Sequence, residues 1–326
     1  MKTKNLILLA GAAAVLGGAA FYLNRGARPA AAALNGKSVL PNLRVADVAR
    51  IEIGDGRLTL AATKDGWQVE SLHGYPADRE KIAENLLRLA DLKVGQVARG
   101  RKLGAETKVA LKDAAGKTLA SLALGDKHAK KASGQAAMYG GGSYPDGRYL
   151  AFGGETVLVK ETLDAFDGDV RSWCSTRIAS VPSDQVTSVS FRHGAETVEL
   201  TKGTNSVWTL KGLTDKEELD TSKTYSLDSA LSYLDFTSVA DPKLTDAELG
   251  FATGVVYTAT VKTGTNVTQR VVRVGNLAPG GTSRYVKLDD GKWTYAVSTY
   301  AAENFMKTRQ DLVKAKDAPK NTEEGK

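Results

Sequence analysis

Three histidines, His73, His128 and His193, are the first candidates for chemistry, because imidazole is a frequent metal ligand and general base. None has a second histidine or a cysteine at the spacing that zinc sites use. A serine–histidine–aspartate triad can draw its members from any part of a chain, but no GxSxG turn is present to carry the nucleophile. The sequence therefore predicts no catalytic residue and no metal ligand, with a hydrolase of unrecognised type as the alternative.

The glycines and the single cysteine give no cofactor site either. LNGKS lacks the earlier glycine of a phosphate-binding loop, and no GxGxxG follows an apolar strand. The clusters GGGSYPDG and APGGTS favour chain reversal, a structural use of glycine. We interpret Cys174 as a small packing residue beside Trp173, since a free cysteine behaves as a small hydrophobe. The sequence predicts no cofactor.

One charged and aromatic segment has no counterpart elsewhere in the chain. Gly125 and Arg148 are 23 positions apart, whereas Gly275 and Arg284 are nine apart, so the first half carries 14 extra residues. Long loops often carry function, and we predict a loop that contacts a partner. A solvated insertion without a role is the alternative. The side chains that this loop offers are Lys127, His128, Lys130, Lys131, Tyr139 and Tyr144.

These residues lie on elements that occur twice. VADVARIEIGDGRLTLAATKDGWQV and PSDQVTSVSFRHGAETVELTKGTNSVWTL each hold a short apolar strand, an alternating strand and a strand with tryptophan, which matches Trp67 to Trp208. DREKIAENLLRLADLKV and DTSKTYSLDSALSYLDF follow, each with apolar residues at helical spacing. Asp78 and Asp220 stand at the matching N-cap positions. A residue present in both copies is a scaffold residue more readily than part of one active site.

Hairpins and a short helical piece close each half. TKVALKDAAGKTLASLALG matches YTATVKTGTNVTQRVVRVG, and RYLAFGGETVLV matches RYVKLDDGKWTYAV. We predict an α+β fold with two tandem divergent repeats of antiparallel strands and hairpins, each with one main amphipathic helix, after an N-terminal transmembrane helix. The predicted segments are an anchor or signal (1–33), the first repeat (45–166), a linker (167–182), the second repeat (183–306) and a polar, partly disordered tail (307–326).

The ends of the chain account for its basic character. Residues 1–33 carry four basic side chains and no acidic one, and residues 307–326 carry six basic and four acidic, which leaves 34 basic and 33 acidic side chains between them. This balance argues against nucleic-acid binding. Leu6 to Leu23 is uncharged and follows Lys2 and Lys4, which predicts an uncleaved membrane anchor; a cleaved secretory signal is the alternative.

The pattern GWQV…YPAD…LLRLADLK, GRYLAF…TVLV, VRSWCSTRI and a degenerate second copy resembles the domain-of-unknown-function 4340 family. The resemblance implies a bacterial protein anchored in the inner membrane with its bulk in the periplasm, often encoded beside gliding-motility-type ABC transporter components. It implies protein partners in the envelope and carries no catalytic signature to transfer. In the family, charged residues commonly follow the linker tryptophan, whereas Cys174 and Ser175 follow Trp173 here.

We therefore expect a non-enzymatic, membrane-anchored accessory protein of a bacterial envelope complex, associated with an ABC transporter. The alternative from a second class is a module that binds surface glycan or peptidoglycan. In that case Tyr139, Tyr144 and Trp293 would stack on sugar rings.

Overall fold

The computed structural model describes residues 34–132, 142–289 and 291–316. The chain divides into two compact units. The first comprises residues up to Ser71 with Pro76–Cys174, and the second comprises Leu72–Tyr75 with residues from Ser175 onward. Each unit is built on a large antiparallel sheet.

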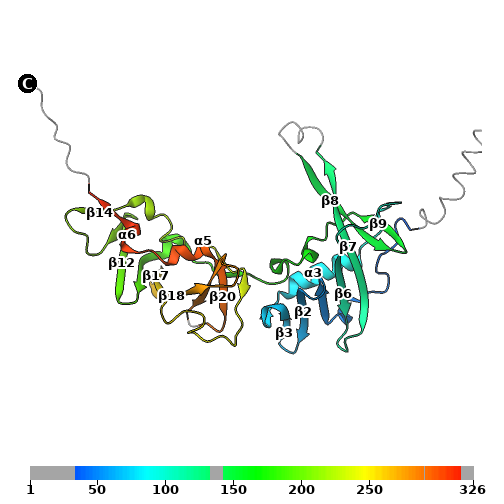
Figure 1. Ribbon diagram of the computed structural model, residues 1–326, viewed down its shortest axis with the longest axis horizontal. Coiled ribbons are helices and arrows are strands. Elements are labelled where there is room, and N and C mark those ends of the chain that lie inside the picture. Colours follow the sequence, from blue (N-terminus) through cyan, green and yellow to red (C-terminus); the bar gives the residue numbers. More distant parts are fainter. Residues whose placement is uncertain (1–33, 133–141, 290, 317–326) are drawn as a thin grey trace, which may run out of the picture. The chain divides into compact units, whose positions relative to one another are not determined.

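The sheet of the first unit has nine strands, in the order β4-β3-β2-β1-β6-β7-β8-β9-β5. Figure 1 shows helix α3 (Arg79–Ala90) lying across it. In several of its strands buried aliphatic residues alternate with more exposed ones, as expected for a half-buried sheet. The strands are β1 (Arg50–Ile53), β2 (Leu58–Thr63), β3 (Gly66–Val69), β4 (Tyr75–Pro76), β5 (Gln96–Val97), β6 (Thr107–Lys112), β7 (Thr118–Lys131), β8 (Ser143–Phe152) and β9 (Glu155–Val159).

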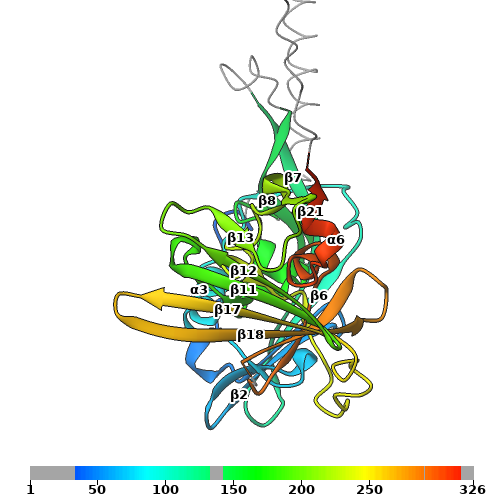
Figure 2. The ribbon, with the colours of Figure 1, turned by 90° about the vertical axis from the view of Figure 1, so that its left-hand side faces the viewer.

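The sheet of the second unit has eight strands, in the order β13-β12-β11-β17-β18-β19-β20-β16. Figure 2 shows its long strands side by side. Two small pairs, β10 with β15 and β14 with β21, complete the unit. The strands are β10 (Arg177–Ala179), β11 (Val186–His193), β12 (Glu196–Lys202), β13 (Trp208–Leu210), β14 (Glu217–Leu219), β15 (Leu234–Asp235), β16 (Ser238–Val239), β17 (Val255–Thr263), β18 (Asn266–Leu277), β19 (Ser283–Leu288), β20 (Thr294–Ser298) and β21 (Val313–Ala315).

The two large sheets share one topology. From β3 to β5, the strand order of the first sheet is repeated strand for strand from β13 to β16 in the second. Ile51 in β1 and Val189 in β11 hold the same position, each paired on both sides and each at most 2% exposed. The second unit therefore offers an internal reference for the first.

The predicted α+β class, with one main amphipathic helix in each repeat, is wrong. The described chain is mostly antiparallel strand, and only the first unit forms the long helix, α3. In the second unit the segment after Asp220 forms a single 3-10 turn, η6 (Thr221–Lys223), and then further turns up to β15. The remaining α-helices of the described residues are α5 (Thr299–Ala302) and α6 (Arg309–Leu312).

Residue type explains why the two segments differ despite the same apolar spacing. The first, REKIAENLLRLA, consists mostly of strong helix formers and buries Ile82, Leu86 and Leu89. The second is rich in serine, threonine and aspartate, whose side chains compete for backbone groups. Thr224 Oγ1 donates to the Thr221 carbonyl at 2.8 Å. Apolar periodicity alone therefore does not make a helix here.

The predicted membrane anchor, Leu6 to Leu23, lies outside the described residues. Within the described ranges, no helix has the length and apolar character needed to cross a membrane. Part of the predicted polar tail is folded, because α6 and β21 fall within residues 307–316, and β21 pairs with β14.

The matched tryptophans and aspartates hold comparable places in the two units. Trp208 is 7% exposed and packs in the core of the second unit, while Trp67 is half-buried and its neighbour Val69 is fully buried. Asp78 caps α3 by accepting the Glu80 and Lys81 amides, and Asp220 accepts the Ser222 amide at the start of η6.

Candidate functional site: the projecting hairpin and its base

Strands β7 and β8 run past the rest of their sheet as a two-stranded ribbon, which we call the arm (residues 127–131 and 143–147). Strand β6 pairs with β7 only as far as Leu124, and β9 pairs with β8 only as far as Arg148. Beyond these positions the described parts of β7 and β8 pair only with each other. Figure 1 shows the ribbon standing out from the first unit. A loop is the sequence-based expectation, but the described part of the segment is strand.

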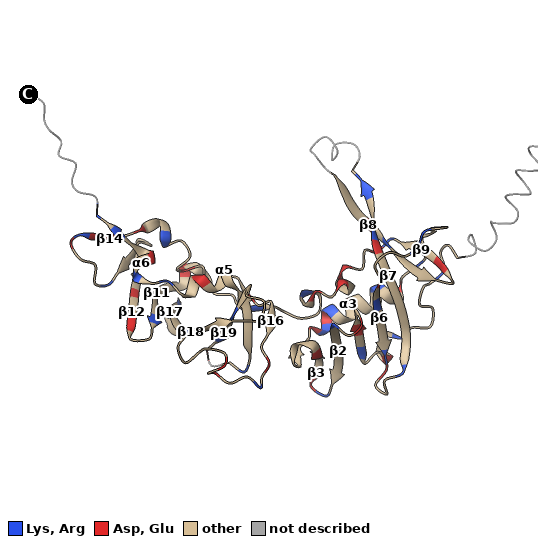
Figure 3. Ribbon diagram, viewed as in Figure 1, with Lys and Arg blue, Asp and Glu red and all other residues tan. Residues whose placement is uncertain are grey.

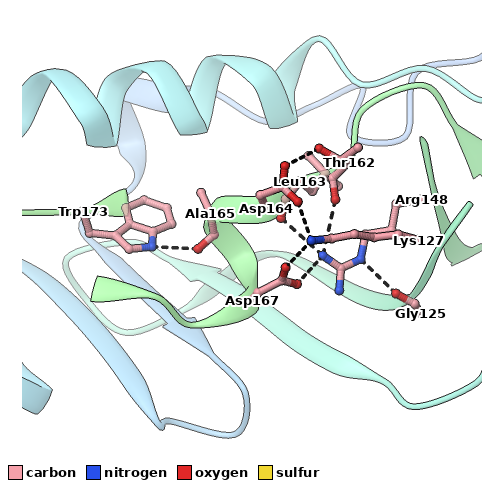
Figure 4. Close-up of polar contacts among 9 residues, drawn as sticks. All are labelled: Gly125, Lys127, Arg148, Thr162, Leu163, Asp164, Ala165, Asp167 and Trp173. Carbon is pink, nitrogen blue, oxygen red and sulfur yellow. Dashed lines mark hydrogen bonds and ion pairs between the residues drawn. The ribbon is translucent and has the colours of Figure 1, made fainter. Parts of the chain in front are cut away.

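A buried arginine sits at the base of the arm. Arg148 is 5% exposed, and its Nε donates to the Gly125 carbonyl at 2.9 Å. Its Nη1 donates to Asp167 at 2.6 Å and to the carbonyls of Leu163 and Thr162 at 3.3 and 3.4 Å. Figure 4 shows these groups converging on the guanidinium. The planar, multi-donor shape of arginine suits such a site.

Lys127 completes a neutral cluster with this arginine. It lies opposite Arg148 across the hairpin and pairs with Asp164 and, at 2.7 Å, with Asp167. The hydrogen bond with Asp164 raises the pKa of Lys127 and lowers the pKa of Asp164 from their ordinary values. Two cations therefore face two carboxylates, which offsets the desolvation of the buried charge and fixes the arm to the body of the unit.

Both carboxylates stand on one short turn, η3 (Asp164–Asp167), which the core holds in place. Phe166 is 1% exposed and meets the ring of Trp173 edge-on, with 5.2 Å between centroids. The Trp173 indole donates to the Ala165 carbonyl at 2.9 Å. Leu163 enters the turn with a φ of 53°, a strained conformation for a branched residue, and its carbonyl is one that Arg148 binds.

The outer part of the arm presents basic and aromatic side chains to solvent. His128 pairs with Asp146 near the base, so this histidine is committed within the hairpin. Lys130, Lys131 and Tyr144 are exposed, with Tyr144 at 49%. Figure 3 shows the basic residues near the outer end of the described ribbon. The arm therefore offers cations and one phenol ring.

Strand addition along the β8 edge of the arm is hindered. Pro145 has no backbone N–H, and the register shifts between the His128 and Ala129 pairs, which bulges Asp146 out of the ladder. Proline and bulges are both features that keep exposed edges from pairing with another chain. Contacts of the arm are therefore expected to involve side chains.

The other sequence-predicted candidates are not part of the described arm. His73 is exposed with a φ of 56°, and His193 Nε2 lies 3.1 Å from the Lys307 carbonyl oxygen. Cys174 is fully buried, and burial raises its pKa to about 11. Tyr139 lies outside the described residues. Over the described ranges, no group of three or more His, Cys, Asp or Glu side chains is placed to hold a metal ion.

Sequence reasoning singled out Lys127 as a residue of a partner-contact loop and missed the other members of the cluster at the base of the arm. It used Arg148 and Arg284 only as markers of the repeat and did not single out Asp164 or Asp167. The available signal was the duplicated arginine itself, which stands before a tyrosine in two matching strands. The carboxylates were harder to find, because they lie 16 and 19 residues beyond Arg148 and meet it only through the fold.

One family comparison bears on the whole arrangement. The family described as a domain of unknown function (DUF4340) matches residues 67–253, which is 187 of the 326 residues, and the match begins in the first unit and ends in the second. No curated protein and no solved structure matches the chain.

Proposed function

The chain belongs to the family of the domain of unknown function DUF4340, and we propose that it is a non-enzymatic accessory protein that binds an envelope protein through the arm. The observation that carries this proposal is that β7 and β8 leave their sheet together and expose Lys130, Lys131 and Tyr144. Because the arm contributes little to the core of its own unit, contact with a binding partner would account for its presence.

The base of the arm supports this role. The Lys127, Arg148, Asp164 and Asp167 cluster ties the ribbon to the folded sheet and fixes the direction in which it points. Preorganised side chains lose less conformational entropy on binding than a mobile loop does. The arm therefore acts as a rigid contact element.

We further propose that the chain is anchored in the bacterial inner membrane by Leu6 to Leu23, with both units in the periplasm. The family resemblance favours a partner in an ABC-type transport complex. The partner surface would be acidic, since the exposed side chains of the arm include two lysines. Binding should then weaken as the salt concentration is raised, because dissolved ions screen the attraction between exposed charges.

Site-specific photocrosslinking of the full chain in native membranes tests this proposal. A photoreactive residue at Tyr144 is expected to crosslink to the ABC transporter membrane subunit encoded beside the gene. The same residue at Lys117, which is exposed in the turn between β6 and β7, serves as the matched control. Equal crosslinking at both positions, or none at Tyr144 in a membrane that holds the transporter, would contradict an arm-mediated contact.

The glycan-binding alternative predicts a different result for the same residue. Retention of the full chain on peptidoglycan, lost in Tyr144→Ala and kept in Lys117→Ala, would assign the exposed ring of the arm to sugar stacking.

A further inference from the structure

The arginine at the base of the arm is repeated in the second unit. Arg284 in β19 holds the position of Arg148 in β8, and in both hairpins the register shifts just before the arginine pair. Arg148 donates to the Gly125 carbonyl at 2.9 Å, and Arg284 donates to the Gly275 carbonyl at 3.0 Å. The two arginines therefore donate to the equivalent glycine carbonyl, Arg148 through Nε and Arg284 through Nη1.

The short turn that follows the last long strand is also repeated, but its chemistry changes. Phe166 and Phe305 are both at most 1% exposed and occupy the same core position in their units. The next residue is Asp167 in the first unit and Met306 in the second. The second unit therefore has the thioether of Met306 where the first unit has the Asp167 carboxylate that pairs with Arg148.

A cavity of about 310 Å³ lies in the second unit where charged side chains fill the first. The residue opposite the arginine changes from Lys127 to Leu277. Arg284, Leu277 and Met306 all line the cavity, so the two apolar replacements form its wall beside the guanidinium. Among the described residues, no carboxylate forms an ion pair with Arg284.

The cavity lining is formally neutral, with two cations and two carboxylates, so it can favour an anion only locally, beside Arg284. Asp311 lines it, but its carboxylate accepts the amide and the hydroxyl of Thr308, at 2.8 and 2.7 Å, in a capping box. Lys307 adds a second cation to the lining. Glu303 faces the cavity from its exposed rim and is the one carboxylate there without such an internal role in the described structure.

We propose that this cavity binds a carboxylate carried on an apolar carbon, which takes the place beside Arg284 that the Asp167 side chain takes beside Arg148. The carboxylate would accept N–H groups of Arg284, and Leu277 and Met306 would contact its hydrocarbon part. This inference is independent of the arm and of its partner.

The size of the cavity limits the ligand. Its volume is at the lower end of the range for small-molecule pockets, roughly 300–1,000 Å³, so it admits a short side chain or a chain terminus. The carboxylate could come from the C-terminus of a peptide with an apolar last residue, or from an acidic side chain of a protein. The experiment below separates these sources.

Calorimetric titration of the full chain in detergent tests the site with small probes. N-acetyl-leucine represents an apolar C-terminus, N-acetyl-glutamate α-amide represents an acidic side chain, and N-acetyl-leucinamide lacks the carboxylate. We expect saturable binding of a carboxylate probe and none of the amide control. Tighter binding of N-acetyl-leucine would identify a chain terminus, and tighter binding of the glutamate probe would identify a side chain.

Two substitutions locate the binding. Arg284→Gln should weaken binding about tenfold or more, as expected for loss of a hydrogen bond between charged groups. Met306→Asp should weaken it similarly, because an internal carboxylate then competes for Arg284 as Asp167 does for Arg148. Lys262→Gln removes an exposed charge elsewhere in the second unit and should leave affinity unchanged.

A further variant keeps the test decisive if the half-buried positions Arg284 and Met306 do not tolerate change. Glu303→Gln removes a carboxylate from the exposed rim and should tighten binding of the preferred probe. Absence of saturable binding by either carboxylate probe would overturn the proposal. Equal affinity in the unchanged chain, Arg284→Gln and Glu303→Gln would do the same.

Discussion

The two units place an arginine at the same position of the sheet and surround it with different side chains. Each places an arginine beside a bulge and lets it donate to a glycine carbonyl. In the first unit Asp167 and Lys127 close the site, and the Arg148 side chain is 6% exposed. In the second, Met306 and Leu277 leave a cavity of about 310 Å³ beside the guanidinium. One backbone arrangement therefore supports a structural ion pair in one copy and an open cationic site in the other.

The comparison also shows what the closed version does. Lys127 and Arg148 lie opposite each other at the point where the arm begins, and Asp167 contacts both. In the second unit β18 ends at Leu277, the position equivalent to Lys127, and no arm follows. The charge cluster and the projecting ribbon occur together, which favours a role for the cluster in holding the ribbon.

The largest difference between the copies should appear when each arginine is removed. Arg148→Ala leaves carboxylates and carbonyls without their donor, and we expect a loss of about 4 kcal/mol in the free energy of unfolding. Arg284→Ala should lose about 1 kcal/mol, because it breaks one hydrogen bond at a half-buried site. Urea denaturation at neutral pH measures both. Equal losses would show that the closed and open sites are energetically alike.

The charge cluster should also make the free energy of unfolding of the first unit depend on pH, and a single substitution should reduce this dependence. The pKa of Asp164 is lowered, so its contribution is present above the unfolded value of about 4 and is lost as the pH falls through the lower folded value. The pKa of Lys127 is raised, so its contribution is present below about 10.4 and is lost as the pH rises through the higher folded value.

Lys127→Leu gives the first unit the side chain that the second unit has at the equivalent position, Leu277. It should reduce the loss of unfolding free energy at both acid and alkaline pH. Urea unfolding at acid, neutral and alkaline pH would measure this change. Lys117→Leu is the control for loss of one exposed charge. If the unfolding free energy of Lys127→Leu varied with pH in the same way as that of the unchanged chain, the charge cluster would not be the source of the pH dependence.

The two aspartate caps should differ in proportion to the helices that follow them. Asp78 accepts two amides at the start of a 12-residue helix, and Asp78→Ala should cost about 1 kcal/mol. Asp220 begins a single 3-10 turn, so Asp220→Ala should cost less. Thermal unfolding followed by circular dichroism compares them. A larger loss of stability for Asp220→Ala would indicate that the turn η6 contributes more to the stability of its unit than its length suggests.

The smallest expected effect comes from closing the open site. Met306→Asp gives Arg284 the partner that Arg148 has, and we expect a gain of about 0.5 kcal/mol in unfolding free energy, typical of a partly exposed ion pair. Urea denaturation without added carboxylate measures it. A large loss would mean that the thioether packs into the core and that the two turns are not interchangeable.

The sequence predicts the duplicated strands but not the features that distinguish the copies. Trp67, Trp208 and the alternating strands before them are local patterns, and the structure has strands at these places. The second helix fails because residues 220–236 have helical spacing with serine and threonine in place of helix formers. The arm is missed as strand because a two-stranded ribbon has no buried face and so shows no apolar alternation.

The candidate site depends on contacts distant in sequence. Asp167 meets Arg148 only because η3 folds back toward the hairpin. The absence of a carboxylate at Met306 becomes apparent only when the second unit is compared with this arrangement. The duplicated arginines are visible in the sequence as markers of the repeat, whereas the carboxylate of one copy and the cavity of the other required the structure.

The most direct test follows both arginines in one sample. The Nε–H resonances of Arg148 and Arg284 can be observed by NMR in the full chain in detergent while the preferred carboxylate probe is added. We predict a saturable shift of the Arg284 resonance and none of the Arg148 resonance, because Asp167 already holds the closed site. Parallel shifts of both resonances, or no shift of Arg284 at saturating probe, would contradict the distinction between an open and a closed arginine.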